Sequence, residues 1–279
     1  MTSTAAVRPE ALPDDERWLV ALDVDGTIMT EDGRISDAVA DEITRLADEG
    51  HAVMIATGRS VEMTLPVMER LGLVSDLVVC ANGAITLERD ETAQTGYRTW
   101  HVEEFDPTEV LTTIHDHLAE SSYAVEDAEG VMRYHGPFPE AAMAARAENV
   151  EFAQLLEQPA TRVVVLSPEH GIDEFLEIVE RMGLSKVNYN VGWTSWLDIA
   201  PDGVSKATAL ERVRQRLGID PDRVFACGDG RNDVDMLRWA SREGRGVAMG
   251  QAPEDVVEVS NEQTGSDRED GLAAALSSL

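Results

Sequence analysis

The sequence has little positive charge for its length. Lysine and arginine together number 23, against 53 aspartates and glutamates, which gives a formal net charge of −30. This excess of negative charge repels polyanions, so it argues against nucleic acid and anionic membrane surfaces as partners. A solvated surface that favours solubility is the simplest explanation of the acidity.

Cysteine is also scarce. Cys80 and Cys227 are too few for a disulfide framework or a zinc site, and the six histidines show no metal-ligand spacing. No apolar run approaches the length of a membrane span, and residues 1–17 lack the basic start and apolar centre of a signal peptide. We therefore expect a soluble, cytoplasmic protein.

One apolar stretch ends abruptly in two acids. The apolar run Trp18–Leu22 is followed by Asp23, Asp25 and Gly26. A continuous apolar run is typical of a strand in a parallel sheet covered by helices, and ligands bind at the carboxyl ends of such strands. Buried carboxylates are costly unless a metal or hydrogen bonds compensate them, so this strand end predicts a chemical site.

Strand and helix patterns alternate near both ends of the chain. Residues 18–80 predict strand, helix, strand, helix and strand, with Ser36 placed to cap the first helix and Pro66 as a kink within the second. This alternation at regular spacing predicts a parallel sheet built from right-handed crossovers. The fold class that we expect is α/β, with a doubly wound, Rossmann-like core.

The middle of the chain has a different pattern. Hairpin-linked strands and helices over residues 88–192 predict an α+β unit, and the alternating pattern returns with a strand at Ser195–Ala200. We therefore predict a discontinuous core, formed by residues 1–87 and 193–279, with a second domain inserted at residues 88–192.

Polar residues recur where the predicted core strands end. In one parallel sheet these ends lie along a single edge, so side chains that are far apart in the sequence would converge there. The residues concerned are Asp23, Asp25, Thr57, Asn82 and Asp229, together with Asp233 at the start of the following helix.

Several carboxylates at one point would repel one another, or take up protons, without a cation among them. Mg²⁺ keeps several waters, so it suits a small set of oxygen ligands and a phosphate better than Ca²⁺ does. A calcium-binding loop does not fit, because Gly26 falls at its fourth position instead of the sixth and Arg34 at its twelfth. A turn with polar caps is the remaining alternative.

Four ordered motifs resemble those of the haloacid dehalogenase superfamily. They are Asp23-Val-Asp-Gly-Thr27, Ala56-Thr-Gly-Arg59, Asp202-Gly-Val-Ser-Lys206 and Gly228-Asp-Gly-Arg-Asn-Asp233. Gly246–Gly250 and Glu269–Gly271 are similar to the closing segment of its Cof-type phosphatases, which carry a large C2 cap between the second and third motifs. The resemblance implies a Mg²⁺-dependent phosphatase that hydrolyses a phosphomonoester of a small metabolite, such as a sugar phosphate, through an aspartyl-phosphate.

The resemblance also implies roles for the acidic residues. Asp23 would be the nucleophile, and Asp25 the general acid and then the general base. The carboxylates of Asp23 and Asp229 and the backbone carbonyl of Asp25 would hold Mg²⁺, with Asp233 supporting its water shell.

Other motif residues would bind the substrate. Thr57, Gly58 and Lys206 would bind the phosphoryl group, where donors and positive charge offset developing negative charge. Asn82 and Asn232 are open between substrate contact and turn formation. The inserted domain would select the substrate, but it carries no motif that we can interpret, and neither the substrate nor the oligomeric state can be named.

Three alternative functions stay open at this point. One is a dedicated sugar-phosphate phosphatase, similar to sucrose-phosphate or mannosylglycerate-phosphate phosphatases. Another is a non-catalytic module that binds a phosphate ester, and a third is dehalogenation. The complete set of motif acids favours phosphoryl transfer over the last two.

Overall fold

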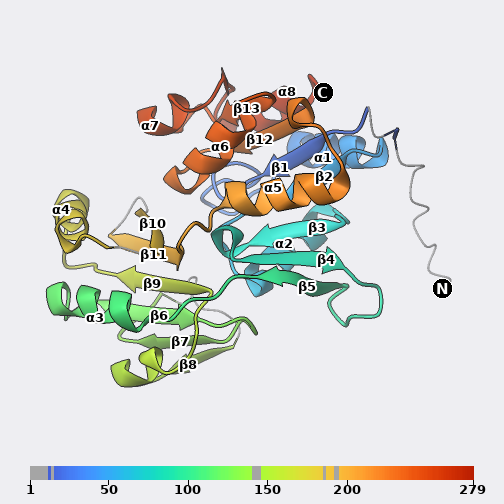
Figure 1. Ribbon diagram of the computed structural model, residues 1–279. Coiled ribbons are helices and arrows are strands. Elements are labelled where there is room, and N and C mark those ends of the chain that lie inside the picture. The colour runs from blue at the N-terminus through green and yellow to red at the C-terminus, as the bar shows by residue number, and fades with distance from the viewer. Residues whose placement is uncertain (1–11, 14–15, 140–145, 185–186, 192–194) are drawn as a thin grey trace. The chain divides into compact units, whose positions relative to one another are not determined.

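The structure, a computed structural model, describes residues 12–13, 16–139, 146–184, 187–191 and 195–279. The chain forms two compact units (Figure 1). The first comprises Met1–Ala56, Val67–Val78 and Leu210–Leu279, and the second comprises Thr57–Pro66 and Val79–Ala209. The chain passes between the units directly after Ala56 and then within helix α2 (Val61–Leu71), strand β3 (Leu77–Cys80) and helix α5 (Lys206–Leu217).

A five-stranded parallel sheet forms the centre of the first unit. Its strands are β1 (Leu19–Leu22), β2 (Ala52–Ile55), β12 (Val224–Gly228), β13 (Arg245–Ala248) and β14 (Glu262–Gln263). They are arranged in the order β14–β13–β12–β1–β2, which places β1 between β12 and β2. Leu22 is in register with Cys227 and with Ile55, so the three strands reach the same edge.

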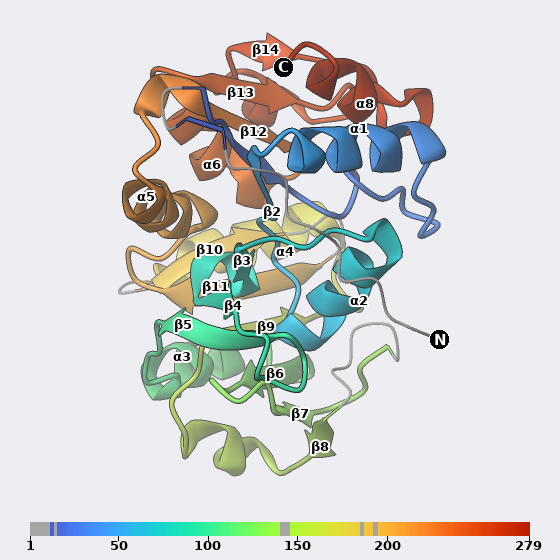
Figure 2. The ribbon, with the colours of Figure 1, turned by 90° about the vertical axis from the view of Figure 1, so that its right-hand side faces the viewer.

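Helices cover both faces of this sheet. They are α1 (Asp37–Asp48), α6 (Val234–Ala240), α7 (Glu254–Val257) and α8 (Gly271–Leu276). Helix α6 packs on β12 and β13, whereas α1 packs on β2 and α8, and Figures 1 and 2 show these two groups on opposite faces. All of β1 is therefore buried, as its apolar sequence predicts. The Ser36 hydroxyl accepts a hydrogen bond from the Val39 N–H and caps α1 as predicted.

The second unit contains a six-stranded sheet. Its strands are β6 (Ser122–Glu126), β7 (Met132–His135), β8 (Ala147–Asn149), β9 (Arg162–Leu166), β10 (Val187–Val191) and β11 (Trp196–Pro201). The order is β10–β11–β9–β6–β7–β8, and every pair except β7–β8 is antiparallel. A smaller sheet is formed by β3, β4 (Ile85–Arg89) and β5 (Tyr97–Val102), and the 3₁₀ turn Ala81–Gly83 lies between β3 and β4.

Helices α3 (Thr108–His117) and α4 (Ile172–Met182) cover one face of the six-stranded sheet. Alternate strand residues, such as Val163 on β9 and Leu197 on β11, form an apolar core with these helices. Because successive side chains in a strand point to opposite faces, Arg162 and Asp198 lie on the other face. That face also carries a smaller apolar cluster around Ala124, Met132 and Val164.

Strand β11 differs from the prediction in its partners. A strand forms over the expected residues, but it pairs antiparallel with β9 and β10 and is absent from the parallel sheet. Strand β3, which was predicted to belong to the parallel sheet, instead pairs with β4. Apolar patterning identifies a strand without identifying its neighbours, which explains both differences. The predicted boundary at residue 193 lies outside the described residues, and the ranges 1–87, 193–279 and 88–192 stay a prediction.

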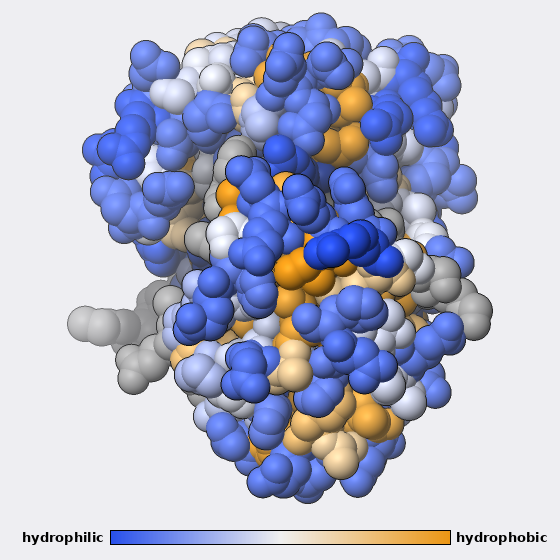
Figure 3. Space-filling view, turned by 90° about the vertical axis from the view of Figure 1, so that its left-hand side faces the viewer, coloured by the Kyte–Doolittle hydropathy of each residue, from blue (hydrophilic) through white to orange (hydrophobic). Residues whose placement is uncertain are grey.

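The surface agrees with the composition. On the face drawn in Figure 3, hydrophilic residues predominate, as the net charge of −30 leads one to expect. Among the helices that the structure describes, none has both the length and the apolar character needed to cross a bilayer.

Candidate active site

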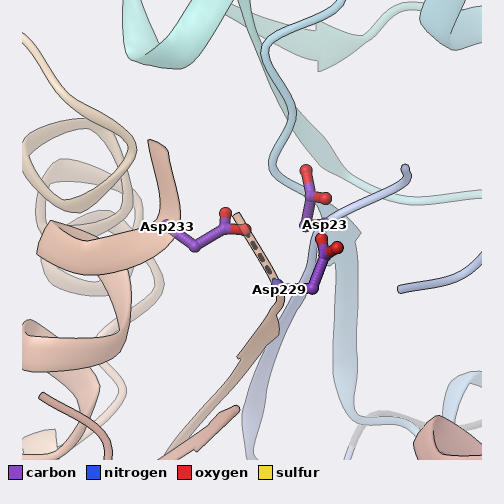
Figure 4. A group of neighbouring side chains, drawn as sticks. All are labelled: Asp23, Asp229 and Asp233. Carbon is purple, nitrogen blue, oxygen red and sulfur yellow. Dashed lines mark hydrogen bonds between the residues drawn. The ribbon is translucent and has the colours of Figure 1, made fainter. Parts of the chain in front are cut away.

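Three aspartates lie together at one edge of the parallel sheet (Figure 4). Asp23 follows β1, Asp229 follows β12, and Asp233 ends a 3₁₀ turn that leads into α6. All three residues are buried, and each offers one carboxylate oxygen to a group in which these oxygens lie within 4.8 Å of one another. The structure thus brings together three of the predicted metal ligands, from segments about 200 residues apart.

Two glycines make room for these carboxylates. A Cβ atom at Gly26 would lie 2.1 Å from Oδ2 of Asp229, and the φ of +75° at Gly26 also favours glycine. At Gly228 a Cβ atom would lie 2.4 Å from Cγ of Asp233. A larger residue at either position would displace an acid of the group.

Asp233 organises the loop that carries Asp229. Its Oδ2 accepts hydrogen bonds from the N–H groups of Asp229, at 3.1 Å, and Gly230, at 3.0 Å. Hydrogen bonds from backbone N–H groups to a carboxylate are charge-assisted and comparatively strong. Asp233 therefore has a structural task in addition to the support of metal-bound water that the resemblance implies.

Gln251 contributes to the same place, although no motif indicated it. Its Nε2 donates to the carbonyl oxygen of Gly26 at 2.5 Å and lies 3.4 Å from Oδ2 of Asp229. Its Oε1 accepts from the Asp267 N–H at 3.1 Å. Gln251 thus connects the turn after β1 with Asp229 and a late loop. The only signal in the sequence was its position directly after the Gly246–Gly250 segment.

Asp25 is different from the three grouped acids, because its side chain is exposed. It lies in the turn after β1, where its backbone forms a bridge with Met29. An exposed carboxyl group can exchange protons with a substrate and with water, which suits the predicted acid and base role. The metal contact predicted for Asp25 involves its backbone carbonyl, so the exposed side chain does not conflict with it.

The other predicted residues, apart from Asn232, belong to the second unit. The Thr57 N–H donates to the carbonyl oxygen of Val79, and the Asn82 N–H donates to that of Thr57, both at 3.0 Å. A Cβ atom at Gly58 would lie 2.9 Å from Oδ1 of Asn82, so the Asn82 side chain lies directly against Gly58. The second motif is therefore held against the turn Ala81–Gly83.

The same turn contacts the start of the third motif's helix. A Cβ atom at Gly83 would lie 2.2 Å from the carbonyl oxygen of Ser205 and 3.2 Å from the backbone nitrogen of Lys206. Lys206 begins α5 and is fully buried, and Thr57 is buried as well. Thr57, Gly58, Asn82 and Lys206 are thus gathered around one turn of the second unit.

Asn232 is the remaining predicted substrate residue. It is half-buried in the first unit, in the turn just before Asp233. Its Oδ1 would lie 2.6 Å from a Cβ atom at Gly230, so its side chain folds back on its own loop. A role as a substrate contact stays a prediction for Asn232.

The acidic group lies close to the buried thiol of Cys227. Burial, together with the nearby charges of Asp233, Asp229 and Asp23, raises the pKa of the Cys227 thiol well above its usual value. Cys227 therefore stays protonated and is a poor metal ligand, which leaves a donor set of carboxylate oxygens. Such a donor set fits a hard cation such as Mg²⁺.

Comparison with known proteins identifies the family. The model of the haloacid dehalogenase-like hydrolases matches residues 20–276. The 5-amino-6-(5-phospho-D-ribitylamino)uracil phosphatase YitU of Bacillus subtilis is 28% identical over 268 residues, covering 93% of this chain and 96% of that protein. The phosphatase YcsE of the same organism, which has the same descriptive name, is 30% identical over 258 residues, covering 92% and 94%.

A solved structure agrees with this assignment. The structure of a subclass IIB sugar phosphatase of the superfamily has a TM-score of 0.77 and 21% identity, covering 94% of this chain and 98% of that one. At this level of identity the likeness shows a common fold. The predicted α/β fold class and the resemblance are both confirmed. The chain belongs to the haloacid dehalogenase-like hydrolase family and is a phosphatase of its Cof-type group.

Proposed function

We propose that this enzyme is a Mg²⁺-dependent phosphatase that hydrolyses a phosphomonoester of a small metabolite through an aspartyl-phosphate on Asp23. The observation that carries the proposal is the group formed by Asp23, Asp229 and Asp233 at the carboxyl edge of the parallel sheet. The two phosphatases from Bacillus subtilis support it, because both match this chain over nearly their whole length and are named for a small phosphorylated substrate.

The first chemical step would use both acids of the first motif. A carboxylate oxygen of Asp23 attacks the phosphorus in line and forms an acyl-phosphate bond. As the bond between phosphorus and the leaving oxygen breaks, the protonated carboxyl group of Asp25 gives its proton to that oxygen, and the alcohol departs.

The second step would regenerate the enzyme. The Asp25 carboxylate takes a proton from a water molecule as the water oxygen attacks the phosphorus. The bond between phosphorus and Asp23 then breaks, which releases inorganic phosphate and the free carboxylate of Asp23. Asp25 returns to its protonated form, so the cycle is balanced in protons. The exposed position of Asp25 supports this exchange with water.

The remaining residues would bind and orient the phosphoryl group. Thr57 and Lys206 would contact its oxygens, and Gly58 would allow close approach. The Asp23 and Asp229 carboxylates and the Asp25 carbonyl would hold Mg²⁺, with Asp233 supporting its water shell. When bound, the ion offsets the negative charge of the acids and of the phosphoryl group.

A sugar phosphate or a similar metabolite is the substrate class that we propose, and a dedicated sugar-phosphate phosphatase is the narrower alternative. Both of the enzyme's cysteines are buried free thiols, which supports a reducing, cytoplasmic location. A polyanion such as nucleic acid is a poor candidate for a surface with a net charge of −30.

The test is a panel of phosphorylated sugars, nucleotides and cofactor precursors, which includes 5-amino-6-(5-phospho-D-ribitylamino)uracil. We expect Mg²⁺-dependent phosphate release and a fall in kcat/KM of about 10³-fold or more for Asp23→Asn. Asp235→Asn is the matched control, because Asp235 lies on α6 and is paired at the surface with Arg238. Activity that survives both chelation and Asp23→Asn would contradict the mechanism, and binding without turnover would indicate a non-catalytic module.

A further inference from the structure

The turn Ala81–Gly83 has a strained backbone. Ala81 has a φ of 49° and Asn82 a φ of 51°, so two successive residues other than glycine adopt the left-handed region. Side chains disfavour this conformation, and an alanine has no polar group to compensate for it. Strained backbone of this kind persists only where surrounding contacts hold it, and it is concentrated at functional sites.

A largely buried ion pair supplies such a contact. Nδ2 of Asn82 donates to Oδ2 of Asp198 at 3.0 Å. Asp198, on β11, is held in turn by Arg162 on β9, whose Nε and Nη2 donate to its two carboxylate oxygens at 2.8 and 2.9 Å. The side chains of Arg162 and Asp198 are only 14% and 12% exposed. The two-pronged geometry fixes the orientation of the carboxylate that Asn82 contacts.

This chain of contacts leads to the predicted phosphoryl-binding residues. Asn82 lies against Gly58, and its N–H binds the carbonyl oxygen of Thr57. The neighbouring Gly83 lies against the backbone of Ser205 and Lys206. A shift of the turn would therefore move the second and third motifs together.

We propose that Asp198 and Arg162 are positioning residues for phosphoryl binding. They hold the Asn82 amide, Asn82 holds the left-handed turn, and the turn places Thr57 and Lys206. This inference rests on the proposed function. It also favours turn formation over substrate contact for Asn82, because its Nδ2 is engaged by Asp198.

The first test exchanges the two hydrogen-bonding partners. Asn82→Asp places a second carboxylate against Asp198, and we expect the inhibition constant for inorganic phosphate to rise about tenfold or more. The double variant with Asp198→Asn restores a donor opposite an acceptor, and we expect it to recover much of the phosphate affinity. A double variant no better than the worse single variant would overturn the proposal.

The second test separates positioning from general stability. In Arg162→Lys the charge stays but the two-pronged contact is lost, so we expect weaker phosphate inhibition and a higher KM. The concentration of Mg²⁺ for half-activation should not change, because the acids that would hold the ion form a separate group. Arg133→Lys is the matched control, since Arg133 on β7 of the same sheet pairs with Asp127 at 2.9 Å.

The outcomes distinguish this inference from the proposed function. A wild-type enzyme that releases no phosphate from any ester would contradict the proposed function itself. An active wild type with equal phosphate inhibition in Arg162→Lys and Arg133→Lys would overturn only the positioning role. Thermal unfolding of each variant shows whether it folds, and if Asn82→Asp does not, the Arg162→Lys comparison decides.

Discussion

Each compact unit buries a group of charged side chains, and the two groups are neutralised differently. In the first unit the grouped residues are three carboxylates, Asp23, Asp229 and Asp233, which are supported by backbone N–H groups and by Gln251. In the second unit two carboxylates, Asp198 and Glu126, lie beside the guanidinium of Arg162. The first group suits an added cation, whereas the second contains its own.

The second group contains two carboxylates, but its one arginine forms hydrogen bonds with only one of them. Asp198 accepts hydrogen bonds from both Nε and Nη2 of Arg162, whereas Oε2 of Glu126 lies 3.9 Å from Nη1 of Arg162. Within the described part of the chain, Oε1 of Glu126 is buried and has no hydrogen-bond partner. Burial raises the pKa of Glu126 to about 7, despite the opposing effect of Arg162. Protonation thus removes the negative charge of Glu126, whereas a bound metal ion would offset the negative charges of the acids in the first unit.

The largest effect that we expect comes from crowding the first group. In Gly26→Ala the new Cβ atom would lie 2.1 Å from Asp229, and we expect the Mg²⁺ concentration for half-activation to rise about 100-fold. Gly33→Ala is a close control, because Gly33 has a φ of +79° and nothing within 4 Å of its Cβ position. It should lose about 1 kcal/mol of stability and keep its Mg²⁺ response. Equal Mg²⁺ responses in the two variants would show that Asp229 is not part of the metal site.

An effect of comparable size, on stability instead of on the Mg²⁺ response, should follow from removing the titrating acid of the second group. The pKa of Glu126 is raised from 4.5 to about 7, so its contribution to stability is present below pH 4.5 and is lost as the pH rises to about 7. In the wild type, the free energy of unfolding should therefore fall by about 3 kcal/mol across that window as Glu126 ionises. In Glu126→Gln this contribution to the pH dependence should be absent. Urea unfolding of wild type and variant at pH 4.5 and pH 8 measures the difference.

The charges around Glu126 are Arg162, which lowers its pKa, and Asp198, Glu62 and Asp127, which raise it. All four are present in both proteins, so they cancel in the comparison of wild type with Glu126→Gln. Glu120→Gln, at an exposed position, controls for the loss of a glutamate. If the free energy of unfolding has the same pH dependence in the two variants, then Glu126 is ionised in the folded protein. The two charged groups would then not differ in the way described above.

The sequence predicted the first group better than the second. Asp23 and Asp229 each follow an apolar strand directly, so a parallel sheet was enough to bring them together. The contact between Asn82 and Asp198 joins residues 116 positions apart, and it depends on β11 pairing with β9. An apolar pattern shows that β11 is a strand but says nothing of its partners. An ion pair such as that of Arg162 and Asp198 has no local signature in the sequence.

The smallest effect concerns Gln251, which the motifs also did not reveal. In Gln251→Ala the hydrogen bond to the Gly26 carbonyl and the contact with Asp229 are lost. One neutral hydrogen bond contributes about 1 kcal/mol, so we expect the Mg²⁺ concentration for half-activation to rise about fivefold, with little change in kcat. Gln263→Ala, on the exposed edge strand β14, should leave it unchanged. A fall in kcat at saturating Mg²⁺ would instead place Gln251 in the chemical step, and the acids of the first unit would then need more than a cation to function.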